Sequence, residues 1–394
     1  MRTGDTSIFR DYQSSHPWIT FQIDLNQCTH DVWMLLGQVQ SKCEHIAGVP
    51  LLPETAKQLY KVYLSKGAHA TTAIEGNTLS EEEVLQRVDG TLELSKSREY
   101  LGIAIDNIIK ACNEIAGAVT QGLPLELTPQ RIRRFNELVL SGLELEDGVV
   151  PGECRQHGVT VARYRGAPPQ DCEFLLEHLC DWLNGLTLEQ ESDDMQFALA
   201  VLKALVAHVY IAWIHPFGDG NGRTARLIEV QLLLQSHHVP LPAAFVLSNH
   251  YNQTRDKYYR ELDRSSRSGG DLEHFFRYSL QGYVDGLRDQ LSFIRNQQLL
   301  VTWEYHVHDL FRNQNTPAAL RRRHLVLDMP DKVVPRSQLT GVSARVMNEY
   351  AGKTDKTLSR DLNALRTMQL VVREGRGFKP NRDRIMAWIP PRSV

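Results

Sequence analysis

The chain has few of the features that mark a specialised class of protein. Its 394 residues include only six cysteines, which are scattered without the paired spacing of a zinc site or a disulfide framework. The formal net charge of −3 gives the whole chain no general preference for nucleic acid or for a membrane surface. We therefore expect reduced thiols, as in a soluble protein of the cytoplasm.

The sequence also lacks long apolar runs and two common nucleotide-binding motifs. Residues 1–15 are polar and charged, unlike a secretory signal, and Lys203 and His208 interrupt the apolar stretch 201–214. We expect no membrane-spanning segment and no membrane partner. Neither a P-loop nor a Rossmann glycine pattern is present. Any phosphate site must therefore be built from another kind of turn.

One dense polar segment does stand out, at residues 215–226: His-Pro-Phe-Gly-Asp-Gly-Asn-Gly-Arg-Thr-Ala-Arg. It lies between the apolar stretches 201–214 and 227–234, so we predict a turn that opens a helix. A helix N-terminus presents unpaired N–H groups and partial positive charge to an anion. Gly220 and Gly222 let the backbone approach a ligand closely. The segment therefore favours binding of a phosphate.

The charged side chains of this segment agree with that prediction. Arg223 and Arg226 lie three residues apart on the first helical turn, an arrangement that suits a polyphosphate. Asp219 could hold a magnesium ion together with phosphate oxygens. His215, with an ordinary pKa of about 6.5, could accept a proton from a hydroxyl near neutral pH. Together these side chains predict phosphate-transfer chemistry.

The same segment resembles the signature of the Fic family, His-Pro-Phe-x-(Asp/Glu)-Gly-Asn-Gly-Arg-x-x-Arg, and matches it at every specified position. Fic proteins are helical enzymes, most of which move AMP from ATP onto a hydroxyl side chain of a target protein. The resemblance implies that His215 is the general base. It also implies that Asp219 binds Mg²⁺ on the α- and β-phosphates of ATP.

The resemblance further places the nucleotide on the turn and the first helical turn. Asn221 and the neighbouring glycine amides would surround the α-phosphate. Arg223 would hold the β-phosphate and Arg226 the γ-phosphate. The implied nucleotide-binding residues of this segment are Gly218, Gly220, Asn221, Gly222, Arg223 and Arg226.

A second motif, at residues 71–76, precedes the first. Apolar spacing predicts a helix over about 54–74, with Gly76 beyond its end. Glu75 would face the negative end of this helix dipole, so a cationic partner would be favourable. The motif resembles the inhibitory pattern (Ser/Thr)-x-x-x-Glu-(Gly/Asn) of many Fic proteins. That resemblance implies that Glu75 pairs with Arg226 and occupies the space of the γ-phosphate. The alternative is an ordinary helix end with a solvated glutamate.

Two further segments have a family counterpart. The alternating residues Val159, Thr160 and Val161 predict a short β-hairpin. It resembles the Fic flap, which aligns the target by strand addition; an ordinary surface hairpin is the alternative. Tyr259 lies in a segment that resembles the nucleotide-base region and could stack on adenine, although a core tyrosine fits as well. Ser266 stands where some relatives have asparagine.

Breaks in the pattern divide the chain into three regions. Residues 1–115 form an N-terminal helical region, residues 116–290 the Fic core, and residues 291–394 a separate domain. Ser80 to Glu83 match a capping box, and Thr128 followed by proline predicts the start of a helix. His208 lies seven residues before His215, but without a third ligand we interpret it as a packed helix histidine.

The last domain has its own pattern. We expect helices over 343–350 and 355–368, then strands over 370–372 and 385–389 around a basic turn. This order resembles a winged helix-turn-helix domain, whose second helix faces DNA. The side chains that would contact DNA are Lys356, Thr357, Ser359, Arg360 and Asn363 on that helix, and Arg373, Arg376 and Lys379 near the wing. The same fold also serves in dimerisation or protein docking.

We therefore predict a mainly α protein with a Fic helical-bundle core, a β-hairpin flap and a C-terminal winged helix-turn-helix domain. The predicted function is autoinhibited transfer of AMP from ATP, with Mg²⁺, to a Ser, Thr or Tyr hydroxyl of a target protein and of the enzyme itself. Three alternatives stay open: removal of AMP from a modified protein, use of another nucleotide donor, and a DNA-binding regulator with a quiescent core. A homodimer also stays open.

Overall fold

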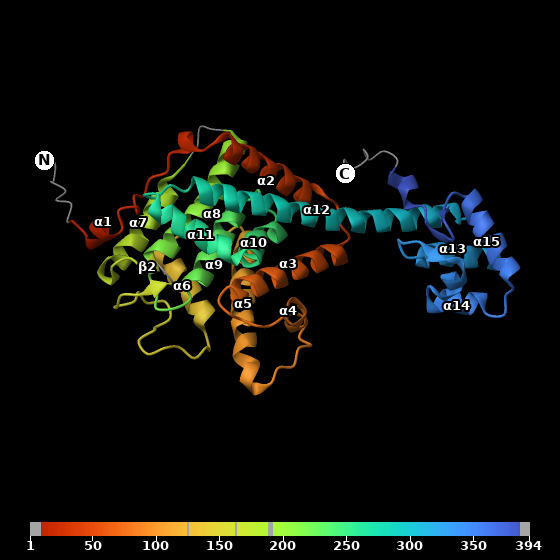
Figure 1. Cartoon of the computed structure of the whole chain (residues 1–394), viewed down its shortest axis with the longest axis horizontal. Coiled ribbons are helices and arrows are strands. Elements are labelled where there is room, and N and C mark those ends of the chain that lie inside the picture. Colours follow the sequence, from red (N-terminus) through yellow and green to blue (C-terminus); the bar gives the residue numbers. More distant parts are fainter. Residues whose placement is uncertain (1–8, 124–125, 162–163, 188–191, 387–394) are drawn as a thin grey trace. The chain divides into compact units, whose positions relative to one another are not determined.

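The chain forms two compact units, Met1–Leu291 and Ser292–Val394. The computed structural model describes residues 9–123, 126–161, 164–187 and 192–386, and these are mainly helical, as predicted (Figure 1). The regions 1–115 and 116–290, expected to be distinct, lie in the same unit.

Two helices form the centre of the first unit. α8 (Asp193–Ile214) and α9 (Asn221–Gln235) pack against each other, and the turn between them carries the segment that begins at His215. α9 also contacts α3, α5 and α6, whereas α8 contacts α2, α7 and α11 (Figure 1). The signature segment is therefore held between the most enclosed helices of this unit.

α8 differs from the sequence-based expectation in one respect. It is long and apolar enough to cross a membrane by length and composition, although Lys203 and His208 lie within it. However, most of this helix is buried inside the protein. A helix that is apolar on all sides is typical of the centre of a bundle.

The surrounding helices of the first unit follow in chain order. They are α1 (Asp11–Ser15), α2 (His30–Gly48), α3 (Pro53–Ala73), α4 (Glu81–Val88), α5 (Glu99–Thr120), α6 (Pro129–Leu140), α7 (Cys172–Gly185), α10 (Val246–Gln253) and α11 (Arg255–Arg267). α12 (Glu273–Leu310) begins in the first unit and ends in the second.

Several helix boundaries agree with the local signals in the sequence. The Ser80 hydroxyl accepts a hydrogen bond from the Glu83 backbone, and the Glu83 side chain returns to the Ser80 backbone, which completes the capping box of α4. The Thr128 hydroxyl caps α6, which starts with proline. α3 ends at Ala73, and Gly76 adopts a positive φ of 96° just beyond it. Glu75 therefore lies in the tight turn after α3.

A short antiparallel hairpin lies between α6 and α7. β1 (Thr160–Val161) pairs with β2 (Tyr164–Arg165), with Thr160 opposite Arg165 and Val161 opposite Tyr164. The Tyr164 hydroxyl donates to the backbone carbonyl of Trp213, in the last turn of α8. This contact fastens the hairpin beside the end of the helix that precedes His215.

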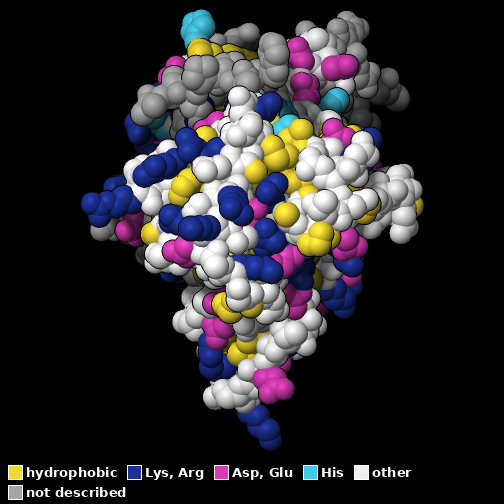
Figure 2. Space-filling model, turned by 90° about the vertical axis from the view of Figure 1, so that its right-hand side faces the viewer, with side chains coloured by type: hydrophobic (Ala, Val, Ile, Leu, Met, Phe, Trp, Pro, Cys, Tyr) yellow, Lys and Arg dark blue, Asp and Glu magenta, His cyan; other side chains and the backbone are white. Residues whose placement is uncertain are grey.

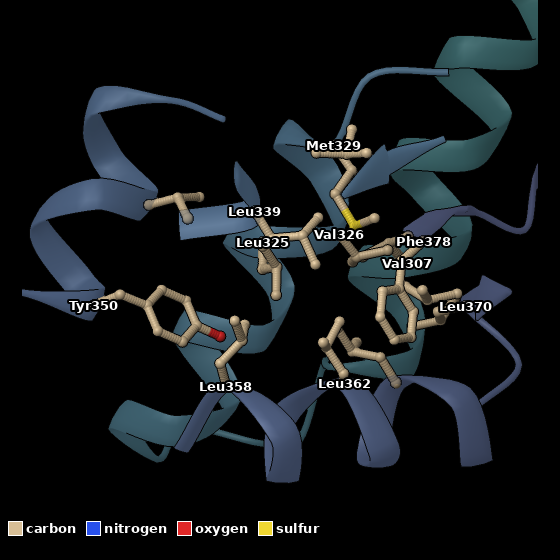
Figure 3. Packing of buried hydrophobic residues seen from close by; sticks show 14 of the residues in the cluster. Val307, Leu325, Val326, Met329, Leu339, Tyr350, Leu358, Leu362, Leu370 and Phe378 are labelled. Carbon is tan, nitrogen blue, oxygen red and sulfur yellow. The ribbon is translucent and has the colours of Figure 1, made fainter. Parts of the chain in front are cut away.

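The second unit has a core of its own. α13 (Pro317–Asp328), α14 (Ala344–Tyr350) and α15 (Asp355–Thr367) pack with β3 (Val334–Pro335), β4 (Val371–Glu374) and β5 (Gly377–Pro380). The sheet is antiparallel with the order β3-β5-β4. Figure 3 shows side chains such as Val326, Leu358 and Leu362 pointing into one common interior.

One strand of the second unit lies elsewhere than predicted. The partner of β4 is β5 at 377–380, whereas residues 382–386 form a 3-10 helix and residues 387–389 lie outside the described part of the chain. Gly375 adopts a positive φ of 55°, which allows a tight turn directly after β4. The hairpin therefore closes about eight residues earlier, and Phe378 is buried beneath it.

All six cysteines lie in the described residues and none forms a disulfide, as the sequence predicts. Cys43, Cys112, Cys172 and Cys180 are buried. Burial raises the pKa of the Cys172 thiol to about 11, so that this thiol is protonated at neutral pH.

Candidate active site

His215 lies at the C-terminal end of α8 with a backbone conformation that is unusual for a residue with a side chain. Its φ of 49° is in the left-handed region, and its N–H donates to the Ile211 carbonyl at 2.9 Å. A non-glycine residue in this region costs about 1 kcal/mol or more. The surrounding contacts must therefore stabilise this conformation.

Arg155 stabilises this conformation of His215. It precedes the hairpin in the sequence and is 3% exposed. Its Nε donates to the carbonyl of His215 at 2.7 Å and its Nη1 to that of His157 at 2.6 Å. Its backbone N–H donates to the Pro216 carbonyl at 2.9 Å. Arg155 thus links the hairpin to the turn after α8. No local sequence pattern predicts this role, because the partners of the Arg155 side chain are backbone carbonyls.

The His215 ring is neutral at physiological pH. Burial, reinforced by the positive charge of Arg155, lowers the pKa of the ring to about 4. A neutral imidazole can accept a proton, so this shift is compatible with the base role predicted for His215.

The turn that follows is fixed by its own side chains. Phe217 is fully buried and its backbone pairs with Cys154. The Asn221 side chain accepts from the Phe217 N–H at 3.0 Å and donates to the Phe217 carbonyl at 2.8 Å. In this structure the Asn221 side chain therefore closes the turn.

The side-chain amide of Asn136, which lies outside the motif, also stabilises the turn. Asn136 of α6 is fully buried, and its Nδ2 donates to the Asp219 carbonyl at 2.8 Å. Its Oδ1 accepts the N–H of Gly152 at 2.9 Å. Gly220 next to it has a φ of 77° and forms the N-cap of α9. Asn136 thereby joins the turn to the segment that leads to the hairpin, a contact that the sequence analysis does not predict.

The two arginines of the motif lie on the first turn of α9 with different partners. Arg223 is 8% exposed and its Nη2 contacts Asp219 Oδ2 at 3.2 Å. Arg226 is 2% exposed, and its Nη2 lies 2.6 Å from Glu75 Oε1. Its Nε also donates to the Thr71 hydroxyl at 2.6 Å. The structure therefore contains the Glu75–Arg226 ion pair that the family resemblance implies.

Charge and position both tie Glu75 to this helix N-terminus. Burial opposes the charged form of Glu75, but the Arg226 guanidinium outweighs it and lowers the pKa of the carboxyl group. A Cβ atom built on Gly222 would lie 2.3 Å from Glu75 Oε1. The carboxylate thus lies against the backbone at the start of α9, where an anion would bind.

A pocket of about 420 Å³ opens over this arrangement. This volume is within the usual range for a small-molecule site. It brings together the two sequence motifs, the hairpin and the segment around Tyr259, whose side chain is 39% exposed. Its walls are formed by Glu75, Tyr164, Ala212, Trp213, His215, Asn221, Gly222, Ala225, Arg226, Asp256, Tyr258, Tyr259, Arg260, Leu262 and Asp263.

Comparison with known proteins agrees with this geometry. Residues 126–233, which hold α8, the turn and nearly all of α9, match the model of the Fic/DOC family. This part of the chain is a Fic domain. Two curated relatives are the protein adenylyltransferase Fic of Drosophila willistoni, 30% identical over 217 residues, and the protein adenylyltransferase fic-1 of Caenorhabditis elegans, 28% identical over 280 residues.

These matches cover only part of each protein. The first includes 55% of this chain and 38% of the relative, and the second 66% and 48%, so the chain spans less than half of the length of either relative.

Solved structures show the same fold. A Fic family protein from Desulfovibrio desulfuricans matches with a TM-score of 0.54 at 19% identity, over 89% of this chain and 96% of that one. Fic-1 of C. elegans, residues 134–508, also matches with a TM-score of 0.54, at 21% identity, over 67% of this chain and 73% of that one.

The Fic motif offers one carboxylate for a metal ion. The Asp219 side chain is 55% exposed, and its Oδ1 accepts the Gly220 N–H at 2.5 Å. Within the described ranges no group of three or more His, Cys, Asp or Glu side chains is placed to hold a metal. Mg²⁺ often takes one or two carboxylates together with phosphate oxygens. Asp219 therefore fits a Mg²⁺ ion that arrives bound to a nucleotide.

Two remaining predictions for the Fic core concern the hairpin and His208. Thr160 and Val161 pair with β2, while Val159 precedes them and its carbonyl accepts the Gly166 N–H at 3.1 Å. His208 is fully buried and hydrogen-bonded to Glu229 and Tyr258. The interpretation of His208 as a packed helix histidine is therefore confirmed.

Proposed function

We propose that the chain transfers AMP from ATP–Mg²⁺ to a hydroxyl side chain of a target protein. The observation that carries this proposal is the placement of a neutral, partly enclosed His215 beside the N-terminus of α9, at the floor of one pocket. The similarity to two proteins named protein adenylyltransferase supports the same chemistry.

In the proposed reaction the phosphates lie along the start of α9. The backbone N–H groups around Gly220 and Gly222, together with Arg223, offset the charge of the α- and β-phosphates. The apolar part of the pocket, with Tyr258 and Tyr259, receives the base. Asp219 would hold Mg²⁺ together with the phosphates, and the bound ion would supply further positive charge. Positioning and charge stabilisation supply most of the rate enhancement.

The target hydroxyl approaches from the side of His215. Its oxygen attacks the α-phosphorus, and the bond between that phosphorus and the oxygen that bridges to the β-phosphate breaks. The hydroxyl proton passes to the His215 ring, and pyrophosphate leaves. The β1–β2 hairpin would align the target by pairing with its extended backbone, a mode that does not depend on the target's side chains. This assigns Val159, Thr160 and Val161 to target binding.

We also propose that Glu75 inhibits this transfer. In this structure it neutralises Arg226 and lies against Gly222, so a γ-phosphate cannot form the same ion pair. ATP would then be held in a pose that does not present its α-phosphate to His215. Glu75→Gly removes the carboxylate and adds glycine at a position that already lies in a turn, so it is expected to raise transfer and self-modification.

Three proteins test both proposals: the wild type, Glu75→Gly, and Glu75→Gly combined with His215→Ala. Each is incubated with α-³²P-ATP and Mg²⁺, and label on protein is measured. Label on the single variant alone supports transfer, inhibition and the base role together. Equal label on the wild type and on Glu75→Gly would contradict inhibition, and label on the double variant would contradict the base role.

Two further assays distinguish the alternative reactions of this site. Glu75 lines the pocket, where a carboxylate could orient a water toward an AMP-modified hydroxyl. Release of AMP from a modified target by the wild type, lost in Glu75→Gly, would favour removal of AMP over transfer. Label from a different nucleotide in a donor panel, with none from ATP, would favour another donor.

A second proposal concerns the Ser292–Val394 unit, which we propose is a winged helix that binds duplex DNA. Residues 292–394 contain 18 lysines and arginines and nine acidic residues, a net charge of +9 in a chain whose total is −3. Figure 2 shows dark blue Lys and Arg side chains gathered on part of the face that it displays. Such charge asymmetry favours a polyanionic partner.

The exposed face of α15 supports the same partner. Lys356, Arg360 and Asn363 are exposed at helical spacing, opposite the buried Leu358 and Leu362. The predicted contact Ser359 is less available, because it accepts from Arg336 at 2.8 Å. At the hairpin tip Arg373 and Arg376 are exposed, whereas Lys379 pairs with Glu374.

Fluorescence anisotropy with a labelled mixed-sequence duplex, over a series of salt concentrations, tests this proposal. Arg360→Ala should weaken binding and lower the salt slope by about one. Arg312→Ala removes another exposed arginine, which is not part of α15 and pairs with Asp309, and serves as the control. A wild type without salt-dependent binding, or equal effects of both variants, would contradict the assignment of this face.

A further inference from the structure

A buried chain of hydrogen bonds connects the three helices that build the pocket. His208 of α8 lies between Glu229 of α9 and Tyr258 of α11. Its Nδ1 is 2.6 Å from Glu229 Oε2, and its Nε2 is 2.8 Å from the Tyr258 hydroxyl. None of the three side chains is more than 3% exposed. α8 also carries His215, and α9 carries Arg226 one turn before Glu229.

Both nitrogens of the His208 ring have a partner. Nδ1 is bonded to a carboxyl oxygen of Glu229, and Nε2 is bonded to the Tyr258 hydroxyl. Tyr251 of α10 donates its hydroxyl proton to the same Glu229 oxygen at 3.1 Å. The His208 ring nitrogens, Glu229 Oε2 and the Tyr258 hydroxyl therefore each have a hydrogen-bond partner, and the Tyr258 hydroxyl is bonded to a fully buried side chain.

These contacts restrict the orientation of the Tyr258 ring. The ring lines the pocket, stacks on Tyr251 at 4.8 Å between centroids, and lies 5.1 Å from the ring of Tyr259. A buried carboxylate and imidazole are costly to desolvate, and apolar residues of similar size often give equal or greater stability. Stability alone therefore does not account for a polar chain at this place, whereas orientation of a pocket wall does.

We propose that His208 is a positioning residue for the donor nucleotide: through Tyr258 it sets the aromatic wall against which the base packs. The inference rests on the proposed function only in taking a nucleotide as the ligand. His208 does not touch the phosphates or the reacting atoms, so its effect is confined to the base end of the ligand. That restriction makes the proposal testable apart from the transfer reaction.

The test measures binding by titration calorimetry, in the Glu75→Gly background so that Arg226 is free for phosphate. The ligands are ATP and inorganic tripolyphosphate, which shares the phosphates but has no base. His208→Leu and Tyr258→Phe are each expected to weaken ATP binding about tenfold, because a misplaced stacking partner loses a large part of the base contact. Both variants should bind tripolyphosphate within twofold of the parent.

Two comparisons exclude a general loss of structure. Tyr251→Phe removes a hydrogen bond to the same Glu229 oxygen but keeps its ring, which lies outside the pocket, so ATP affinity should stay within twofold. Combining His208→Leu with Tyr258→Phe should cost no more than one change alone, because His208 acts through Tyr258. If His208→Leu does not fold, Tyr258→Phe carries the test.

Each outcome has a distinct meaning. Equal loss of ATP and tripolyphosphate, or equal loss in Tyr251→Phe, would overturn the positioning role. Additive losses in the double variant would show that His208 does not act through Tyr258 and would overturn it too. A parent that binds tripolyphosphate but no ATP would instead contradict the proposed donor, which separates failure of the function from failure of this inference.

Discussion

Transfer by the Glu75→Gly variant is expected to change little between pH 5 and pH 8. His215 must be neutral to accept the hydroxyl proton, and burial together with Arg155 lowers the pKa of its ring to about 4. The neutral fraction is then about 0.9 at pH 5 and close to one at pH 7. With an ordinary histidine pKa of about 6.5, the neutral fraction at pH 5 would be only about 0.03.

Single-turnover transfer from α-³²P-ATP measures this difference, at constant ionic strength and saturating Mg²⁺. The rate at pH 5 should lie within about twofold of the rate at pH 7. A fall of roughly 25-fold, the ratio given by an ordinary histidine pKa, would refute the assignment of a depressed pKa to the catalytic base. Circular dichroism at each pH serves as the control, because loss of folded protein would also lower the rate.

Three further changes follow from contacts described above. Asn136→Ala leaves the Gly152 N–H and the Asp219 carbonyl without their buried partner, so the free energy of unfolding in urea should fall by about 2 kcal/mol; an unchanged value would contradict the bracing role. Gly222→Ala places a methyl group 2.3 Å from Glu75 Oε1, so it should lower Tm more in the wild type than in Glu75→Gly; equal losses would argue against this contact. His215 and His250 both have folded pKa values of about 4, below the ordinary histidine value, so the unfolded chain binds more protons as pH falls. Stability should therefore be full above about pH 6.5 and decline toward pH 4, by on the order of 2 to 3 kcal/mol for each histidine, as measured by denaturation across this range.

Local patterns in the sequence were sufficient for much of the fold. The capping box at Ser80, the Thr128 cap and the turn that opens α9 are all found where the residues predict them. These features depend on neighbours within four positions along the chain, so a single sequence contains the necessary information. The pairing of Glu75 with Arg226 spans 151 residues, and only its resemblance to a family motif predicted it.

The supporting contacts of the site could not be predicted in the same way. Arg155 and Asn136 form hydrogen bonds to backbone carbonyls far away in the sequence. Every residue has a backbone carbonyl, so no sequence motif marks these partners. His208 is 21 residues from Glu229 and 50 residues from Tyr258 in the sequence. These side chains meet only because three helices pack together. The second strand was expected at 385–389 and lies at 377–380, because its glycine and proline are weak strand signals whereas residues 385–389 are mostly apolar.

The left-handed backbone conformation of His215 lowers the stability of the fold at the position where we propose the catalytic base. Arg155 bonds the carbonyl of His215 and not its ring, so this conformation would persist without the imidazole. Glycine adopts it without strain, and His215→Gly should therefore abolish transfer while it relieves up to about 1 kcal/mol. Glycine would therefore be the more stable residue at this position, and the base role that we propose accounts for a histidine there.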